Sequence, residues 1–288
     1  MEAEMTTTYV SVDGDLQAAS GRHLSALDRG FTLGDGAFET IRVARGKPFR
    51  WQAHLARLRG ALEALHLPLA WSDERLAEAV AELLAANGLR EAVVRVTVSR
   101  GVPRERGLLP QGDSATVVVQ TSPFRALPAE RIARGVRAHT SAIRRNETSP
   151  TSRLKTCNYL DNVLALLEAR RHGADEAILL NTAGYLACAS AANLHIVRGG
   201  RILTPALACG VLPGITREAV RELSAALGLV WEETWLRPAD LEDAEEAFLT
   251  NSVGGVLPLT IVDGQAIGSG HPGQLTLLLR QQHEESQA

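Results

Sequence analysis

Hydrophobic positions recur at two different spacings in the first half of the chain, and these spacings predict both helices and strands. Apolar residues at intervals of three and four over 51–65 and 73–87 predict two amphipathic helices. The first ends at His66-Leu67-Pro68, and the second ends at Gly88. Alternation of apolar and polar residues, with turn residues between the runs, predicts strands over 9–16, 38–43, 91–99 and 115–120.

The second half repeats this mixture without a strict strand–helix alternation. Strands are predicted over 136–140, 177–181, 185–189, 193–197, 247–250 and 259–262. Helices are predicted over 158–172, 216–227, 239–244 and 272–282. The proline-containing stretch around 121–129 separates the two halves. The pattern therefore predicts an α+β protein with a small N-terminal domain (1–121), a linker (122–130) and a larger C-terminal domain (131–288).

Composition and charge narrow the possible functions. The chain has 288 residues, 45% of them hydrophobic and 22% charged, with a formal net charge of −3. This small net negative charge gives no overall electrostatic attraction to nucleic acid or to an anionic membrane. Charged residues interrupt every apolar run before it reaches membrane-spanning length. The N-terminus is acidic and does not resemble a signal peptide. Three cysteines without metal-type spacing fit a reduced, cytoplasmic protein.

Several common kinds of active site are not supported by the sequence. The eight histidines include no pair at zinc-binding spacing, so no metal site is predicted. There is no Gly-x-Ser-x-Gly, no Gly-x-Gly-x-x-Gly and no phosphate-binding P-loop motif. A serine hydrolase, a nicotinamide enzyme and an ATP-dependent enzyme are therefore not indicated.

Lysine is rare in this chain, and one lysine stands out. Only Lys47 and Lys155 are present among 30 basic residues. A desolvated lysine can lose its proton and form a Schiff base, whereas arginine cannot. Lys47 lies in a turn sequence, whereas Lys155 lies between irregular chain and a predicted helix, where catalytic groups are often held. The alternative interpretation of Lys155 is a surface lysine at a helix start.

Three places are suited to binding an anion. Residues 210–217 place Pro213 and Gly214 directly before a helix, whose free N–H groups favour phosphate. Residues 249–255 run from a strand end into small, polar and glycine-rich chain. Arg57 could pair with an anion through two N–H groups. Taken singly, each is better explained by a simpler feature: an ordinary helix cap, a plain loop and a solvated arginine.

These segments match, in order and spacing, the motifs of a known family. The motifs are Asp28-Arg29-Gly30, Gly34-Asp35-Gly36-Ala37-Phe38-Glu39, His54-Leu55-Ala56-Arg57, Leu154-Lys155-Thr156-Cys157-Asn158-Tyr159, Ala192-Asn193-Leu194, Gly214-Ile215-Thr216-Arg217 and Thr250-Asn251-Ser252. From about residue 28 to 258, the chain resembles the class IV aminotransferases, the fold-type IV enzymes that use pyridoxal 5'-phosphate. The resemblance implies a small N-terminal α/β domain, a larger C-terminal domain with a mixed, barrel-like sheet, and a homodimer.

The resemblance also implies roles for individual residues. Lys155 would form the Schiff base with the cofactor and move the substrate's α-proton. The implied cofactor contacts are Arg57, Ile215, Thr216 and Ser252 at the phosphate, with Tyr159 and Asn193 supporting the ring. The implied substrate contacts are Phe38, Val253 and either Arg104 or Arg106. The two arginines lie in a long polar loop whose simpler interpretation is an exposed basic loop.

One position departs from the family's pattern. Where relatives place a glutamate against the pyridine nitrogen, this chain has Cys188. A carboxylate would keep that nitrogen protonated, whereas a thiol is only a weak donor. The resulting hypothesis is a less protonated ring nitrogen; the alternative is a passively packed Cys188.

The motifs leave the reaction open between two members of the family. The forms around Lys155, Asn193 and Ser252 look most like aminodeoxychorismate lyases and D-amino acid aminotransferases, and less like branched-chain aminotransferases. Transamination between an amino acid or amine and a 2-oxo acid is the first interpretation, and 4-amino-4-deoxychorismate lysis, which supplies 4-aminobenzoate, is the second. A non-catalytic cofactor-binding relic is the third, although it has no need of the reactive Lys155.

Overall fold

The computed structural model describes residues 8–110 and 114–287 of the chain. Contacts divide the chain into two compact units. Unit 1 comprises 1–125 together with Leu154–Asn158, and unit 2 comprises Ala126–Arg153 and Tyr159–Ala288. The predicted domains differ from these units in one respect, because the segment that carries Lys155 clusters with the N-terminal unit. No helix of the described residues is long and apolar enough to cross a membrane.

Unit 1 is built on a six-stranded antiparallel sheet. The strand order is β2-β1-β6-β5-β3-β4. The strands are β1 (Tyr9–Val12), β2 (Asp15–Ala18), β3 (Gly36–Ala44), β4 (Lys47–Pro48), β5 (Ala92–Ser99) and β6 (Thr116–Pro123). In β5, buried positions alternate with half-buried ones, as expected for a strand with one face on the core.

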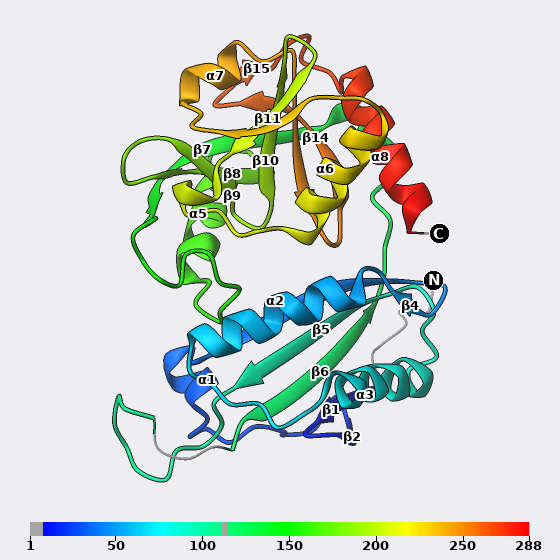
Figure 1. The fold of residues 1–288 in the computed structure, drawn as a ribbon, viewed down its shortest axis with the longest axis vertical. Helices are drawn as coiled ribbons and strands as arrows, with labels where there is room; N and C mark the ends of the chain where they lie inside the picture. The colour runs from blue at the N-terminus through cyan, green and yellow to red at the C-terminus, as the bar shows by residue number, and fades with distance from the viewer. Residues whose placement is uncertain (1–7, 111–113, 288) are drawn as a thin grey trace. The chain divides into compact units, whose positions relative to one another are not determined.

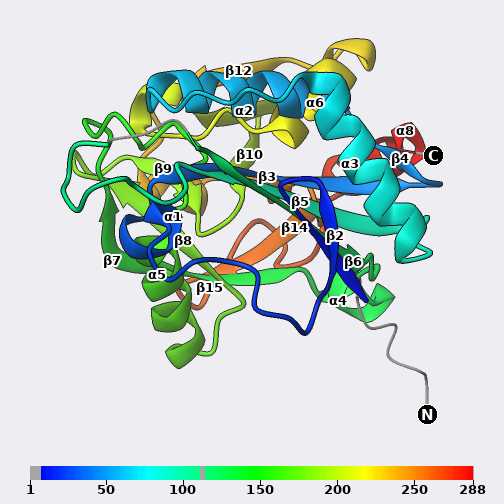
Figure 2. The same ribbon diagram turned by 90° about the horizontal axis from the view of Figure 1, so that it is seen from below.

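Helices α2 (Trp51–Ala64) and α3 (Asp73–Ala86) cover one face of this sheet, as Figure 2 shows. Their apolar faces pack on the strands in a single core, which includes Leu58, Leu83, Ile41 and Val96. Ser72 caps α3 by accepting a hydrogen bond from the backbone N–H of Arg75. Helix α1 (Arg29–Leu33) precedes β3 and is capped by the side chain of Asp28.

Unit 2 contains a closed barrel of six strands. The pairings run β10-β13-β14-β7-β8-β9, and β9 pairs again with β10 to close the ring. The barrel strands are β7 (Val136–Arg145), β8 (Glu176–Asn181), β9 (Leu186–Ala189), β10 (Asn193–Arg198), β13 (Glu246–Asn251) and β14 (Gly255–Val262). Strand β7 runs parallel to both β8 and β14, so the sheet is mixed. Strands β11 (Arg201–Pro205) and β12 (Trp231–Thr234) extend it beyond β10, and β15 (Gln265–Ala266) pairs with β14.

Five helices and one 3₁₀ turn complete the described part of unit 2. They are α4 (Ala129–Arg134), α5 (Leu160–Arg171), η1 (Leu207–Cys209), α6 (Ile215–Ala226), α7 (Pro238–Glu242) and α8 (Gln274–Ser286). Helix α5 packs on β7 and β8, and α8 packs on β13 and β14 (Figure 1). The barrel is filled by aliphatic side chains such as Ile178, Leu194 and Leu259.

The two-unit α+β prediction is confirmed, with a barrel in the C-terminal unit. Several short elements were not predicted from the sequence: α1, β2, β4, α4, β11, η1, β12 and β15. Strand β12 has the sequence Trp-Glu-Glu-Thr and is too polar to alternate visibly, and it is fixed by parallel pairing with β11. The boundary between the two units lies between Arg125 and Ala126, within the stretch 121–129 that the sequence analysis singled out, although β6 continues to Pro123 and α4 begins at Ala129.

Candidate active site

Lys155 is held in unit 1 by backbone hydrogen bonds to the start of β3. The backbone N–H of Phe38 donates to the Lys155 carbonyl at 2.9 Å, and the Cys157 N–H donates to the Gly36 carbonyl at 2.9 Å. A bridge between Ala37 and Thr156 completes this short antiparallel pairing. A Cβ at Gly36 would lie 2.5 Å from the Val98 carbonyl oxygen, so this close approach needs glycine. The lysine therefore extends from a rigid sheet edge.

The environment of the Lys155 amine makes it easy to deprotonate. Burial, followed by the positive charges of Arg57 and Arg95, lowers its pKa to about 8, while the charge of Glu39 acts in the opposite direction. Its Nζ lies 4.4 Å from the centre of the Phe38 ring. A substantial fraction of the amine is therefore neutral near pH 8, as a nucleophile or a general base requires.

A buried cluster on the core face of unit 1 fixes Arg57. The Glu39 carboxylate accepts hydrogen bonds from Arg57 Nε at 2.7 Å and Arg57 Nη2 at 2.8 Å. It also accepts from His54 Nδ1 at 2.7 Å. Burial alone would raise the pKa of Glu39, but hydrogen bonds from His54 and Arg57 and their charges lower it to about 2. Burial lowers the pKa of His54.

Glu39 was not among the residues predicted from the sequence, although the sequence carried a signal for it. It is a carboxylate within the otherwise apolar face of a strand, opposite the helix that carries His54 and Arg57. Such a residue needs a buried partner.

In unit 2 the turn before α6 has the features of an anion site. Gly214 is the N-cap residue of α6 and has no side chain to cap the first N–H groups, which belong to Ile215 and Thr216. The Asn193 side chain donates to the Leu212 carbonyl at 2.9 Å and so fixes the turn. A Cβ at Gly214 would lie 1.9 Å from Asn193 Oδ1, so a larger residue there would displace the Asn193 side chain that fixes the turn. Thr216 is 3% exposed.

A second polar turn of unit 2 follows β13. The Asn251 side chain accepts from the backbone N–H groups of Val253 at 3.0 Å and Gly254 at 2.7 Å, which shapes the turn that holds Ser252. Thr250 pairs with Asn193 across β13 and β10, so this turn and Asn193 lie close together. The Thr250 hydroxyl is buried and has no hydrogen-bond partner among the described residues. A polar ligand would satisfy it.

Cys188 lies in β9, opposite Asn193 of β10 in the pairing that closes the barrel. Its thiol is buried, and burial raises its pKa, so it is a neutral group. The nearby Glu176 is half-buried, and this desolvation raises its pKa; it accepts hydrogen bonds from Ser190 and from the Ala177 backbone. Tyr159 directly precedes α5 at its N-cap position, without a side-chain capping bond.

The two remaining predicted substrate groups lie on exposed chain. Arg104 and Arg106 are exposed in the loop between β5 and β6, and Val253 is 41% exposed. Phe38, by contrast, is 5% exposed and lies beside Lys155.

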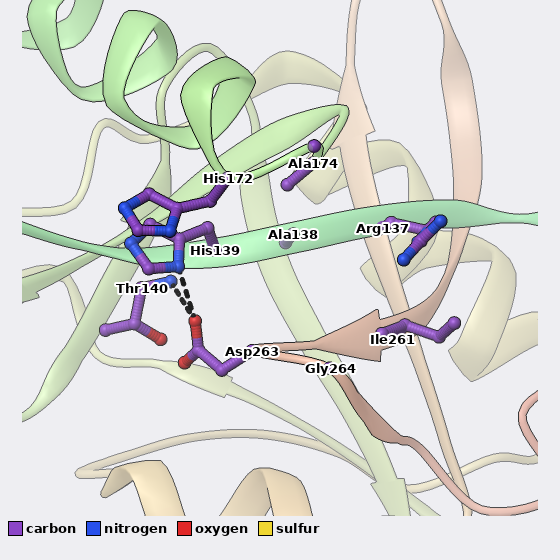
Figure 3. Close-up of a pocket in the computed structure, with 10 residues that line it drawn as sticks. Arg137, Ala138, His139, Thr140, His172, Ala174, Ile261, Asp263 and Gly264 are labelled. Carbon is purple, nitrogen blue, oxygen red and sulfur yellow. Dashed lines mark hydrogen bonds and ion pairs between the residues drawn. The ribbon is translucent and has the colours of Figure 1, made fainter.

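A separate cavity in unit 2 contains none of these residues. It has a volume of about 530 Å³ and is lined by β7, the end of α5 and the turn after β14 (Figure 3). His139 and His172 stack there with ring centres 4.0 Å apart, and Asp263 pairs with His139 at 2.9 Å. The described residues contain no group of three or more potential metal ligands. Lys155, the turn before α6 and the turn after β13 do not line this cavity.

Comparison with known proteins decides the family. Residues 36–262 match the family described as Amino-transferase class IV. The chain belongs to the class IV aminotransferases. Members of this family use pyridoxal 5'-phosphate, so the protein is a pyridoxal phosphate-dependent enzyme.

Individual relatives differ in their named substrates. A Methanocaldococcus jannaschii protein provisionally named a branched-chain-amino-acid aminotransferase is 33% identical, over 91% of this chain and 90% of its own. The D-alanine aminotransferase of Bacillus licheniformis is 32% identical over 93% of each chain. Overall identity therefore does not separate the two substrate classes.

Solved structures show the same fold. The T.th. branched-chain amino acid aminotransferase with pyridoxamine 5'-phosphate superposes with a TM-score of 0.92, at 30% identity, over 97% of this chain and 94% of that one. A Legionella pneumophila protein provisionally named a 4-amino-4-deoxychorismate lyase gives a TM-score of 0.86 at 27% identity, over 93% and 97% of the two chains.

The residues present fit a phosphorylated aldehyde cofactor. Unit 1 offers a readily deprotonated amine and an arginine fixed by Glu39, and unit 2 offers a helix start with glycine at its N-cap and the buried Thr250 hydroxyl, which has no partner among the described residues. The deprotonated amine is what an aldehyde needs to form a Schiff base, and the N–H groups at the helix start are what a phosphate needs.

Proposed function

We propose that this enzyme transfers an amino group between an amino acid or amine and a 2-oxo acid, with Lys155 as its catalytic residue. The observation that carries the proposal is the lowered pKa of Lys155, beside Arg57 and Phe38, in a chain of the class IV family. When bound, pyridoxal phosphate supplies an aldehyde and a ring that withdraws electrons from the substrate's α-carbon.

Lys155 has two tasks in this proposal. Its neutral Nζ would be the atom that holds the cofactor's aldehyde carbon, and, when free, it would be the base that accepts the substrate's α-proton. Because the pKa of the free amine is about 8, Nζ can both take up and return a proton near neutral pH. The Phe38 ring shields one side of Nζ from water.

The phosphate is assigned to four residues. Ile215 and Thr216 would donate backbone N–H groups at the start of α6, and Thr216 and Ser252 would add hydroxyls. Arg57 would contribute charge, and Glu39 holds its guanidinium in one orientation. Asn193 supports the turn before α6 through Leu212.

The pyridine ring is assigned to Cys188 and Tyr159. The neutral thiol of Cys188 cannot act as the carboxylate counterion that the family's pattern places at this position. We therefore assign the ring nitrogen a lower degree of protonation than in relatives that have glutamate there.

The substrate is assigned to the loop after β5 and to the side chains near Lys155. Arg104 or Arg106 would pair with a carboxylate, while Phe38 and Val253 would contact the rest of the substrate. Both loop arginines are exposed, which leaves their N–H groups accessible to solvent.

A homodimer is supported by the surface of α5. Leu160, Val163, Leu164 and Leu167 are 69%, 50%, 45% and 49% exposed. Their spacing places them along one stripe of the helix. A second copy of the chain would cover such an apolar stripe. Cytoplasmic localisation stays a prediction from the sparse cysteines, all three of which are free.

A panel of substrates tests the reaction. D-alanine, L-leucine and (R)-phenylethylamine are supplied in turn with a 2-oxo acid, and the new amino acid is measured. Transamination predicts a stoichiometric exchange with at least one donor, abolished in Lys155→Ala. The lyase, favoured by the likeness to the Legionella protein, instead releases 4-aminobenzoate and pyruvate from aminodeoxychorismate without an acceptor. Cofactor binding without turnover of any of them would indicate a relic.

A further inference from the structure

The loop between β5 and β6 is longer than a connection between adjacent antiparallel strands needs. Hairpin loops usually have two to five residues, whereas β5 ends at Ser99 and β6 begins at Thr116. The described part of the loop carries exposed arginines at 104 and 106 and two exposed leucines, Leu108 and Leu109, at 83% and 81%. An exposed loop is readily mobile, so contacts that other segments make with it decide how well it is held.

Arg29 supplies that fixation. Its Nη1 donates to the Gly107 carbonyl at 2.8 Å, and its Nη2 donates to the Leu108 carbonyl at 2.9 Å. Its backbone N–H donates to the Gly101 carbonyl at 2.9 Å. The Arg29 side chain is 6% exposed, so the donor end of these part-buried bonds is shielded from water.

Asp35 holds Arg29 in this position. It accepts from Arg29 Nε at 2.8 Å and from Arg100 Nε at 2.8 Å. Arg100 in turn donates to the carbonyls of Leu65 and His66 at the end of α2. The loop's base is thereby joined to the helix layer of unit 1 through two arginines that share one carboxylate.

We propose that Arg29 is a positioning residue that fixes the loop of residues 101–110 through the Gly107 and Leu108 carbonyls. The planar fork of an arginine can bond two adjacent carbonyls and a carboxylate at once, whereas lysine cannot. Anchoring the loop would also present Arg104 and Arg106 to a substrate carboxylate, and this consequence rests on the proposed function. The anchoring of the loop by Arg29 does not depend on the proposed function.

Trypsin tests the anchoring directly, because the loop contains its cleavage sites after Arg104 and Arg106. In Arg29→Lys we expect cleavage after Arg106 to become roughly tenfold faster or more, as the loss of two charge-assisted hydrogen bonds implies. Peptide mass spectrometry of timed digests of the holoenzyme measures each bond separately. Cleavage after Arg106 at the wild-type rate would overturn the proposal.

Arg59→Lys is the matched control. Arg59 also lies in unit 1 and also joins an aspartate, Asp73, to the backbone carbonyls of Leu69 and Trp71. The same substitution there removes the same kind of bonds without touching the loop. It should leave cleavage after Arg106 unchanged, and equal acceleration in both variants would overturn the proposal in favour of general loosening.

The wild-type protein provides a measurement that holds even if Arg29→Lys does not fold. A synthetic peptide of residues 102–110 sets the rate of an unanchored loop. The intact protein should be cut after Arg106 at least tenfold more slowly, and an equal rate would overturn the proposal.

Kinetics then separate the anchoring from the proposed function. With the loop loosened, KM for the carboxylate substrate should rise about tenfold while kcat changes little. Faster cleavage with unchanged KM would leave the anchoring in place and overturn the assignment of Arg104 and Arg106 to the substrate.

Discussion

Replacing Lys155 by methionine should stabilise the cofactor-free protein while abolishing its activity. Most substitutions at buried positions destabilise a protein. Here, however, folding lowers the pKa of the amine from 10.5 to about 8, because the folded state disfavours its charge. Methionine has a similar length and no charge to desolvate.

The size of the effect follows from the pKa. A fall from 10.5 to about 8 corresponds to a cost of about 3 kcal/mol whenever the amine is protonated in the folded protein. Removing it should raise the melting temperature by roughly 6–12 °C at pH 7. Between pH 8 and 10.5 the unfolded chain holds a proton that the folded protein has released. Wild-type stability therefore gains on the variant through this window, and the difference disappears above it.

Thermal and denaturant unfolding of the cofactor-free proteins at pH 7 and pH 10.5 measure this difference. The cofactor must be removed first, because a ligand bound only to the folded wild type would hide the effect. Lys47→Met, at an exposed position of the short strand β4, is the control and should change stability by less than about 0.5 kcal/mol. A destabilised Lys155→Met protein, or a difference that is the same at both pH values, would refute the reasoning.

Three further outcomes follow from the assigned roles. Arg57→Gln removes a charge that lowers the pKa of Lys155, so that pKa should rise above about 8, and acylation of the amine should then require a higher pH. The affinity for the cofactor should also fall by roughly 10–100-fold. Unchanged affinity in equilibrium dialysis would show that Arg57 does not bind the phosphate. Cys188→Glu should return a counterion to the ring nitrogen and change the visible spectrum of the bound cofactor or the turnover rate; identical spectra and rates would mean that Cys188 only packs. Leu164→Glu, in the apolar stripe of α5, should lower the mass measured by light scattering from that of a dimer to that of a monomer of 30.9 kDa. A wild-type protein that is already monomeric would refute the proposed homodimer.

Parts of the site were visible in the sequence because single residue types carry their chemistry. Lysine is so rare here that Lys155 stood out, and the Pro-Gly sequence before Ile215 predicted a helix start that the structure confirms. The structure also places Phe38 next to Lys155 and Asn193 against the turn before α6, while their predicted contacts with substrate and cofactor stay predictions.

Other parts could not be read from the sequence because they arise from pairing between distant segments. Glu39 acquires its role only when β3 lies against α2, where it meets His54 and Arg57. Closure of the barrel depends on the single pairing of Cys188 with Asn193, which no local pattern encodes. Likewise Arg29 and Gly107 are 78 positions apart, and their contact follows from the sheet rather than from either motif.

Reduction with borohydride after incubation with pyridoxal phosphate tests the central claim most directly. The reagent converts a Schiff base into a stable secondary amine, and the chain offers only two lysines to carry it. We predict the pyridoxyl mass increment on the peptide that contains Lys155, at one per chain, and none at Lys47. A colourless protein with Lys155 unmodified, or modification at Lys47 alone, would contradict the account.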